Sequence, residues 1–211
     1  MNNRRIRRYG SAAWLIECDA SEVTGLLAAI DSGLPSVTEA TPGARSLLVR
    51  YDPAATDADD LARQLKQLTP KEADPASEEI VTLPVSYTGP DLQSAASACG
   101  LTVNELISRH HAPIYSVAFC GFAPGFAYLT GLDSRLQLPR RSSPRSRVEP
   151  GSVAIAAEYS AVYPSASPGG WHLLGNCPTV LFSIDRDPPA VLLPGKRVKF
   201  VPLPGSPGSQ P

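Results

Sequence analysis

A run of arginines between residues 135 and 147 is the part of the sequence best suited to hold an anion. No acidic residue stands between Asp133 and Glu149, and Pro139 and Pro144 stiffen the stretch. A guanidinium presents a planar fork of donors that matches a carboxylate or a phosphate. We expect Arg141 and Arg145 to contact the substrate; the alternative is a solvated basic loop. The run comprises Arg135, Arg140, Arg141, Arg145 and Arg147.

His172 is the candidate for proton transfer, because imidazole titrates near neutral pH and this residue follows a Gly-rich turn. The alternative is a structural histidine. His110 and His111 are neighbours on a predicted helix and point about 100° apart, so they cannot chelate one ion together. We therefore predict no metal site. The four cysteines have no short spacings, which indicates reduced thiols of a cytoplasmic protein.

The stretch from Phe119 to Leu132 combines rings with glycines, a mixture that suits a sharp turn beside a ligand or a partner. Pro124 and Gly125 predict a type II turn, because Pro presets φ and Gly accepts a positive φ. A plain apolar turn that fills a core is the alternative. The candidate substrate-binding residues here and in a later Tyr-Pro pair are Gly121, Phe122, Pro124, Gly125, Phe126 and Tyr163.

Composition excludes several classes of function. The chain has 211 residues, 43% of them apolar, with a net charge of −1 and a pI of about 6.3. These values give no electrostatic basis for binding nucleic acid or an anionic membrane. No apolar run approaches the roughly 20 residues that cross a bilayer, and the basic N-terminus leads into no signal-peptide core. We find no Walker loop and no Gly-x-Ser-x-Gly elbow.

The first part of the chain predicts an α+β domain over residues 1–78. Apolar spacing indicates two helices, one capped by Ser21 and one starting at Thr56 with Asp59 in a capping box. The order β-α-β-β-α-β is ferredoxin-like, with Pro84 in an edge strand. Polar residues Lys71 to Ser77 predict a linker. The expected strands are Ala13–Cys18, Pro35–Ala40 and Ser46–Tyr51 around a turn at Pro42–Gly43, and Ile80–Tyr87.

The second part predicts a domain over residues 79–203 with two short helices followed by strands. Thr102 and Glu105 form the clearest capping box of the chain. No helical period of useful length follows residue 111. Residues 204–211 predict a disordered tail. The expected strands are Tyr115–Cys120, Ser152–Ala157, Trp171–Leu174, Val180–Ile184 and Arg197–Val201.

Several ordered motifs of the second part resemble a known family. The block from Cys120 to Leu129, Cys-Gly-Phe-Ala-Pro-Gly-Phe-Ala-Tyr-Leu, is similar to the signature of the family of 5-oxoprolinase B subunits, also called allophanate hydrolase subunit 1. That family includes an inhibitor of a sporulation histidine kinase. The matching blocks that follow in the same order are Pro139–Arg145, Glu149–Val153, Val162–Pro164, Ser167–Trp171 and Leu193–Pro202.

The resemblance implies a cyclophilin-like β-barrel behind the small α+β domain. It also implies two partners, a C subunit similar to a biotin-dependent carboxyltransferase and a further A subunit, and ATP with magnesium used by the hetero-oligomer. Such a complex resembles a hydrolase that opens 5-oxoproline, a lactam, to glutamate. An unstrained lactam resists water, so phosphorylation of the amide oxygen would make its carbon electrophilic, and arginines would offset the charge that develops.

Two alternatives differ in class from a hydrolase subunit. The sequence departs from the family pattern at Ala157 to Ala161 and at Asn176–Cys177, next to the expected pocket. These departures motivate a regulator that inhibits a sensor histidine kinase and does no chemistry. The other alternative is a binding module for small carboxylic acids, without ATP hydrolysis. Copurification of a kinase, or ligand binding without turnover, would distinguish them from a hydrolase subunit.

Overall fold

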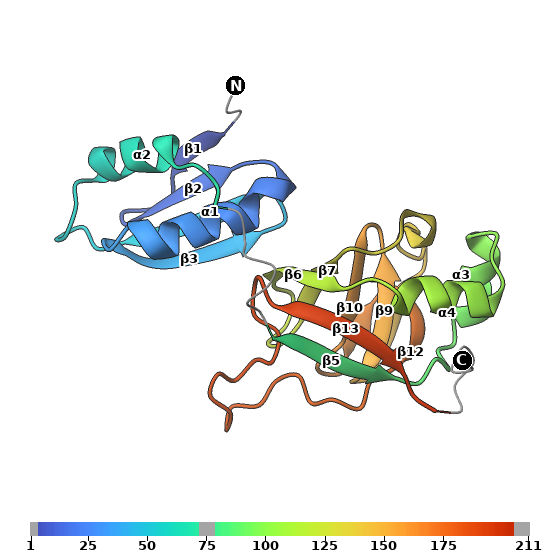
Figure 1. Cartoon of the computed structure of the whole chain (residues 1–211). Helices are drawn as coiled ribbons and strands as arrows, with labels where there is room; N and C mark the ends of the chain where they lie inside the picture. The colour runs from blue at the N-terminus through green and yellow to red at the C-terminus, as the bar shows by residue number, and fades with distance from the viewer. Residues whose placement is uncertain (1–3, 72–78, 205–211) are drawn as a thin grey trace. The chain divides into compact units, whose positions relative to one another are not determined.

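The computed structural model describes residues 4–71 and 79–204 (Figure 1). The chain divides into two compact units, Met1–Ser77 and Glu78–Pro211. The expected linker, apart from Lys71, and the expected tail, apart from Pro204, lie outside the described residues. Within those residues, no helix has the length and apolar character needed to cross a bilayer.

The first unit is one antiparallel sheet with two helices that share its apolar core. The strand order is β1-β2-β4-β3. Leu26 and Ile30 from the first helix and Leu61 and Leu65 from the second are buried in the same cluster as Ile16 and other strand residues. The elements are β1 (Arg5–Arg8), β2 (Ala13–Glu17), α1 (Ala20–Gly33), β3 (Val37–Gly43), β4 (Ser46–Tyr51) and α2 (Ala58–Gln67).

The ferredoxin-like layer is confirmed, but its outer strand comes from an unexpected place. The strand beside β2 is β1, at the start of the chain, and the predicted use of Ile80–Tyr87 in this sheet is wrong. Three of the four residues of β1 are arginines, which hides a strand from a hydrophobicity pattern. Its registry is held by the ladder with β2 and by an ion pair between Arg7 and Glu17.

Aspartates, rather than the predicted Ser21 and Thr56, begin the two helices. Asp19 is the N-cap of α1, and Asp57 is the N-cap of α2, where its carboxylate accepts from Asp59 N at 2.8 Å. The predicted turn at Pro42–Gly43 is also wrong, because both residues pair with β4 and the chain turns after them. A carboxylate caps a helix N-terminus at least as well as a hydroxyl does, so neighbouring candidates compete.

The second unit is a seven-stranded barrel, as expected for a cyclophilin-like domain. The sheet order is β12-β9-β10-β7-β6-β13-β5, and the end strands meet where Ser86 and Asn176 exchange two backbone hydrogen bonds of 2.8 Å. Pro84 lies in β5, the last strand of that order, and not in the sheet of the first unit, where the sequence predicted it at an edge. The strands are β5 (Ile80–Val85), β6 (Tyr115–Cys120), β7 (Ala127–Thr130), β9 (Ser152–Ala156), β10 (Tyr159–Val162), β12 (His172–Asn176) and β13 (Arg197–Pro202).

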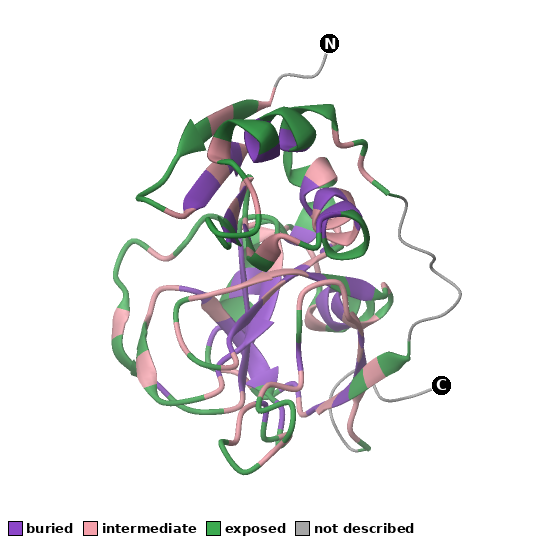
Figure 2. Cartoon of the chain, turned by 90° about the vertical axis from the view of Figure 1, so that its left-hand side faces the viewer, coloured by how far each residue is buried: buried purple, intermediate pink, exposed green. Residues whose placement is uncertain are grey.

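Two helices pack against the barrel, and buried residues gather along its strands (Figure 2). The two helices are α3 (Leu92–Ala98) and α4 (Val103–His111), and α4 begins with the predicted Thr102–Glu105 capping box. A separate two-stranded ribbon pairs β8 (Arg145–Val148) with β11 (Ser167–Gly169), and a short 3-10 turn covers Ser134–Leu136.

The predicted strand Val180–Ile184 is wrong. The segment forms an isolated bridge between Phe182 and Ala190, and Ile184 is 84% exposed. Its apolar residues therefore do not indicate a buried strand. Conversely, β7, β8, β10 and β11 were not expected. Each has only three or four residues, and β8 and β11 contain Arg, Gly or Pro.

Candidate functional site

Aromatic rings form a cluster of their own, separate from the main barrel core. Phe126 lies at its centre, 2% exposed, with its ring centroid 5.1–5.7 Å from those of Phe122, Tyr128, Tyr163 and Trp171. All four pairs are edge-to-face, the arrangement that the ring quadrupoles favour. Rings from three separate segments of the chain thus build one wall.

The loop between β6 and β7 places two of these rings by means of two tight turns. Phe126 N donates to Ala123 O at 2.9 Å and Gly125 has φ 80°, which confirms the predicted turn at Pro124–Gly125. A Cβ at Gly125 would lie 2.6 Å from Phe182, so only glycine fits. The sequence therefore selects Gly there for both space and backbone angle.

Phe122 holds a strained backbone at the tip of the same loop. Its φ is 71°, and Ala123 N donates to Gly121 O at 2.9 Å across it, which makes a γ-turn. A bulky residue in this conformation costs of order 1–3 kcal/mol. The ring is nevertheless 61% exposed, so its burial within this chain does not offset that cost. Strain of this kind concentrates at binding sites.

A cavity of about 250 Å³ opens against this wall. Burial raises the pKa of the Tyr163 hydroxyl, although the charge of Arg140 acts in the opposite direction. The site is thus mostly apolar, with one cation, Arg140, and two tyrosines, Tyr128 and Tyr163, among the residues that line it. The lining residues are Phe122, Phe126, Tyr128, Arg140, Pro144, Tyr163, Pro168, Gly169, Gly170 and Trp171.

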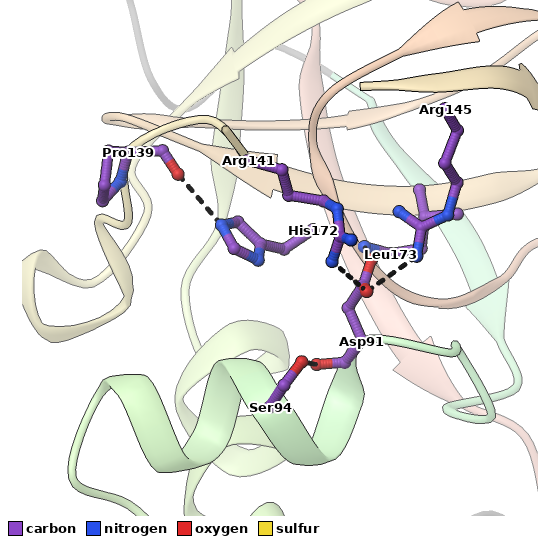
Figure 3. Close-up of polar contacts among 7 residues, drawn as sticks. All are labelled: Asp91, Ser94, Pro139, Arg141, Arg145, His172 and Leu173. Carbon is purple, nitrogen blue, oxygen red and sulfur yellow. Dashed lines mark hydrogen bonds and ion pairs between the residues drawn. The ribbon is translucent and has the colours of Figure 1, made fainter. Parts of the chain in front are cut away.

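The two arginines expected to contact the substrate bind an internal carboxylate instead (Figure 3). Arg141 Nη1 and Arg145 Nη2 each donate to Asp91 Oδ1 at 2.7 Å. Leu173 N donates to Asp91 Oδ2 at 2.8 Å. Asp91 was missed in the sequence, where it looks like an ordinary helix cap. Neither arginine is among the residues that line the cavity, and their contact with a substrate stays a prediction.

His172 points to a backbone carbonyl rather than to the cavity (Figure 3). Its Nε2 lies 2.9 Å from Pro139 O. A carbonyl oxygen only accepts, so Nε2 carries the proton and donates it. This bond ties β12 to the segment that precedes the arginines. The catalytic role of His172 stays a prediction, and the geometry gives the ring a structural task.

Three of the remaining predicted residues, Gly121, Pro124 and Gly125, are not among those that line the cavity. Gly121 lies beside Tyr128, Pro124 forms the turn, and Gly125 packs on Phe182. Phe122, Phe126 and Tyr163 do line it. Of the lining residues that we did not single out, Gly170 is invisible to pattern reasoning because its role depends on a contact with a distant segment.

The barrel, the small α+β unit and the ring-lined cavity define the class of this protein. The family described as "Carboxyltransferase domain, subdomain C and D" matches residues 4–192, and the chain belongs to it.

Within this family, the chain is similar to B subunits of 5-oxoprolinase, which confirms the resemblance seen in the sequence motifs. The chain is 39% identical over 173 residues to the B subunit of 5-oxoprolinase from Escherichia coli O157:H7, covering 80% of this chain and 79% of that protein. It is 34% identical over 222 residues to the B subunit of 5-oxoprolinase from Bacillus subtilis (strain 168), covering 93% and 92%. The solved structure of TTHA0988 matches with a TM-score of 0.76 and 32% identity, covering 95% of this chain but only 41% of that one.

Proposed function

We propose that this chain is one component of an ATP-dependent hydrolase complex that opens 5-oxoproline to glutamate and works only with partner subunits. The likeness to two relatives named as B subunits of 5-oxoprolinase, over 80% and 93% of this chain, carries the proposal. Such a name implies an assembly. In TTHA0988 the matched part is joined to a longer remainder, which supports action beside another polypeptide segment.

The task we assign to this chain is substrate binding at the ring-lined cavity. Its volume of about 250 Å³ suits a molecule of lactam size better than a nucleotide. The aromatic rings offer an apolar wall to a five-membered ring. A cation at that wall suits the carboxylate of a small acid. These features favour a small carboxylic acid or lactam as substrate.

ATP and magnesium enter the proposal only at the level of the complex. We assign no step at ATP to this chain. The expected partners are a carboxyltransferase-like C subunit and an A subunit, with the exposed Phe122 of the β6–β7 loop as an interface anchor.

Reconstitution tests the proposal directly. The chain is mixed with the two expected partners, and glutamate and ADP are measured with 5-oxoproline and ATP. We expect both products in equal amounts from the full mixture and from no mixture that omits one component. Matched controls omit ATP or replace 5-oxoproline by proline, which lacks the lactam bond. No turnover in any combination of the purified subunits would reject the proposal.

A further inference from the structure

Arg140 is the arginine of the 135–147 run that reaches the ring-lined cavity. Its side chain is exposed, and within the described part of the chain it has no ion pair. Arg141 and Arg145 differ, since both guanidiniums bind Asp91. A cation that lines a cavity and faces no protein carboxylate is available to the anion of a ligand.

The backbone on both sides of Arg140 is held by hydrogen bonds to residues distant in sequence, of which Figure 3 shows the one from His172. On one side, Pro139 O accepts from His172 Nε2 at 2.9 Å. On the other side, Arg141 N donates to Gly170 O at 2.8 Å. Gly170 lines the same cavity, so the second bond joins the segment to the cavity wall. A guanidinium on a fixed backbone loses less freedom when it binds an anion.

Asp91, the N-cap residue of α3, anchors this arrangement. It is 3% exposed, and its carboxylate accepts three hydrogen bonds. Burial alone would raise the pKa of Asp91, but the bonds from Arg145 and Leu173 and the charges of both arginines outweigh burial and leave the pKa below its ordinary value. The carboxylate is therefore ionised at neutral pH and neutralises one of its two arginines.

We propose that Arg140 binds the carboxylate of the ligand in the ring-lined cavity, and that Asp91, Arg141 and His172 are positioning residues that hold the Arg140 backbone in place. The ligand class is a small acid with one carboxylate and a flat, weakly polar body. The inference rests on the proposed function for the choice of 5-oxoproline as the probe. It moves the anion contact from Arg141 and Arg145, the residues that the sequence favours, to their neighbour.

A rival site exists beside Asp91. Arg141 Nε and Arg145 Nη1 are buried and have no hydrogen-bond partner among the described residues. Two guanidiniums on one carboxylate also leave a net positive charge. An anion seated there would use these two donors and would not need Arg140. Substitutions at Arg140 and at Arg145 therefore separate the two sites.

The test compares two probes on the full chain by calorimetry, with Trp171 fluorescence as a second readout. 5-Oxoproline carries the carboxylate, and 2-pyrrolidinone is the same lactam without it. The variants are Arg140→Gln, Arg145→Gln and, as a matched control from the same run, Arg147→Gln, whose native partner is the exposed Glu149. Wild-type chain is expected to bind 5-oxoproline more tightly than 2-pyrrolidinone.

The proposal predicts that Arg140→Gln weakens 5-oxoproline binding about 10- to 100-fold and leaves 2-pyrrolidinone binding unchanged. Arg147→Gln changes neither, and Arg145→Gln changes both probes by the same factor, because it loosens the wall. A selective loss of 5-oxoproline in Arg145→Gln, with normal binding in Arg140→Gln, would overturn the proposal. Binding of neither probe by the wild-type chain would also overturn it. If the reconstituted complex nevertheless turned over 5-oxoproline, only the role of Arg140 would be rejected, and the proposed function would be retained.

Discussion

Both ring nitrogens of the buried His110 have hydrogen-bond partners inside the second unit. Its Nε2 lies 2.9 Å from Ser160 Oγ, and its Nδ1 lies 2.7 Å from the Tyr87 hydroxyl. Ser160 donates its own proton to Ala154 O, so it accepts from Nε2–H, and the Tyr87 O–H donates to Nδ1. Each polar atom of the neutral ring has a partner, which fits a structural residue of the barrel core.

The stability of the second unit should fall as the pH drops below 6.5, the ordinary pKa of a histidine such as His110. Burial, with a smaller effect of His111, lowers the pKa of His110 to about 3 from 6.5. Between these values the unfolded chain binds a proton that the folded chain does not, so the free energy of unfolding decreases with falling pH, by at most about 1.4 kcal/mol per unit. Urea unfolding at pH 7, 6 and 5 measures this slope.

Two histidine variants isolate the source of that slope. His110→Gln cannot titrate and should lower the slope, whatever its effect on stability at pH 7. His111→Gln serves as the comparison, because the pKa of His111 is also lowered, mainly by burial, but its ring is only partly buried. A slope that His110→Gln leaves unchanged, or a wild-type chain equally stable at pH 7 and pH 5, would contradict this account.

The β6–β7 loop divides its two phenylalanines between packing and binding. Phe126→Ala should lower the free energy of unfolding by about 3–5 kcal/mol, because it removes the centre of the ring cluster. Phe122→Ala should change stability by less than about 1 kcal/mol, since the ring is exposed and its backbone is strained.

Denaturant unfolding measures these differences in stability, and size-exclusion chromatography with the partner subunits measures assembly. If Phe122 is an interface anchor, Phe122→Ala weakens assembly while the isolated chain keeps its stability. Normal assembly of Phe122→Ala would remove the loop tip from the interface. A Phe126→Ala chain as stable as wild type would show that the ring cluster contributes little.

At the scale of the elements, local rules predicted some features and failed at others, such as the helix caps at Ser21 and Thr56 and the turn at Pro42–Gly43. The Thr102–Glu105 box and the turn at Pro124–Gly125 depend on neighbouring residues, and both are confirmed. The strand order was not predictable in the same way, because β1 pairs through a charged sequence and β5 joins a different sheet.

The candidate site depended even more on contacts between distant segments. Asp91 and Arg145 are far apart in sequence, and their ion pair follows from the fold of the barrel. Of the arginine-rich segment and the rings that the sequence pointed to, Arg140 and several rings line one cavity. The sequence alone did not indicate which of the arginines would pair with the carboxylate of Asp91.

For the whole molecule, the chain divides in sequence between residues 77 and 78 into two units, and each unit has its own apolar core. The ring cluster and its cavity belong entirely to the second unit. The substrate contacts that we assign to this chain therefore need only the barrel.

The central claim is that the complex handles its substrate at the ring-lined cavity, and filling that cavity tests it most directly. Gly170 lines the cavity, and an added Cβ there would meet Pro144 Cβ only at 3.5 Å, an ordinary contact. Gly170→Leu should therefore fold while its side chain occupies the space for the substrate. Gly33→Leu, where an added Cβ has no atom within 4 Å, is the matched control in the first unit.

The measurement is the rate of glutamate formation from 5-oxoproline by reconstituted complexes that contain each variant, with assembly checked by size-exclusion chromatography. We predict that the Gly170→Leu complex assembles normally and turns over at least about tenfold more slowly than wild type, whereas the Gly33→Leu complex keeps the wild-type rate. A Gly170→Leu complex with wild-type rate and KM would contradict the claim that the substrate binds in this cavity.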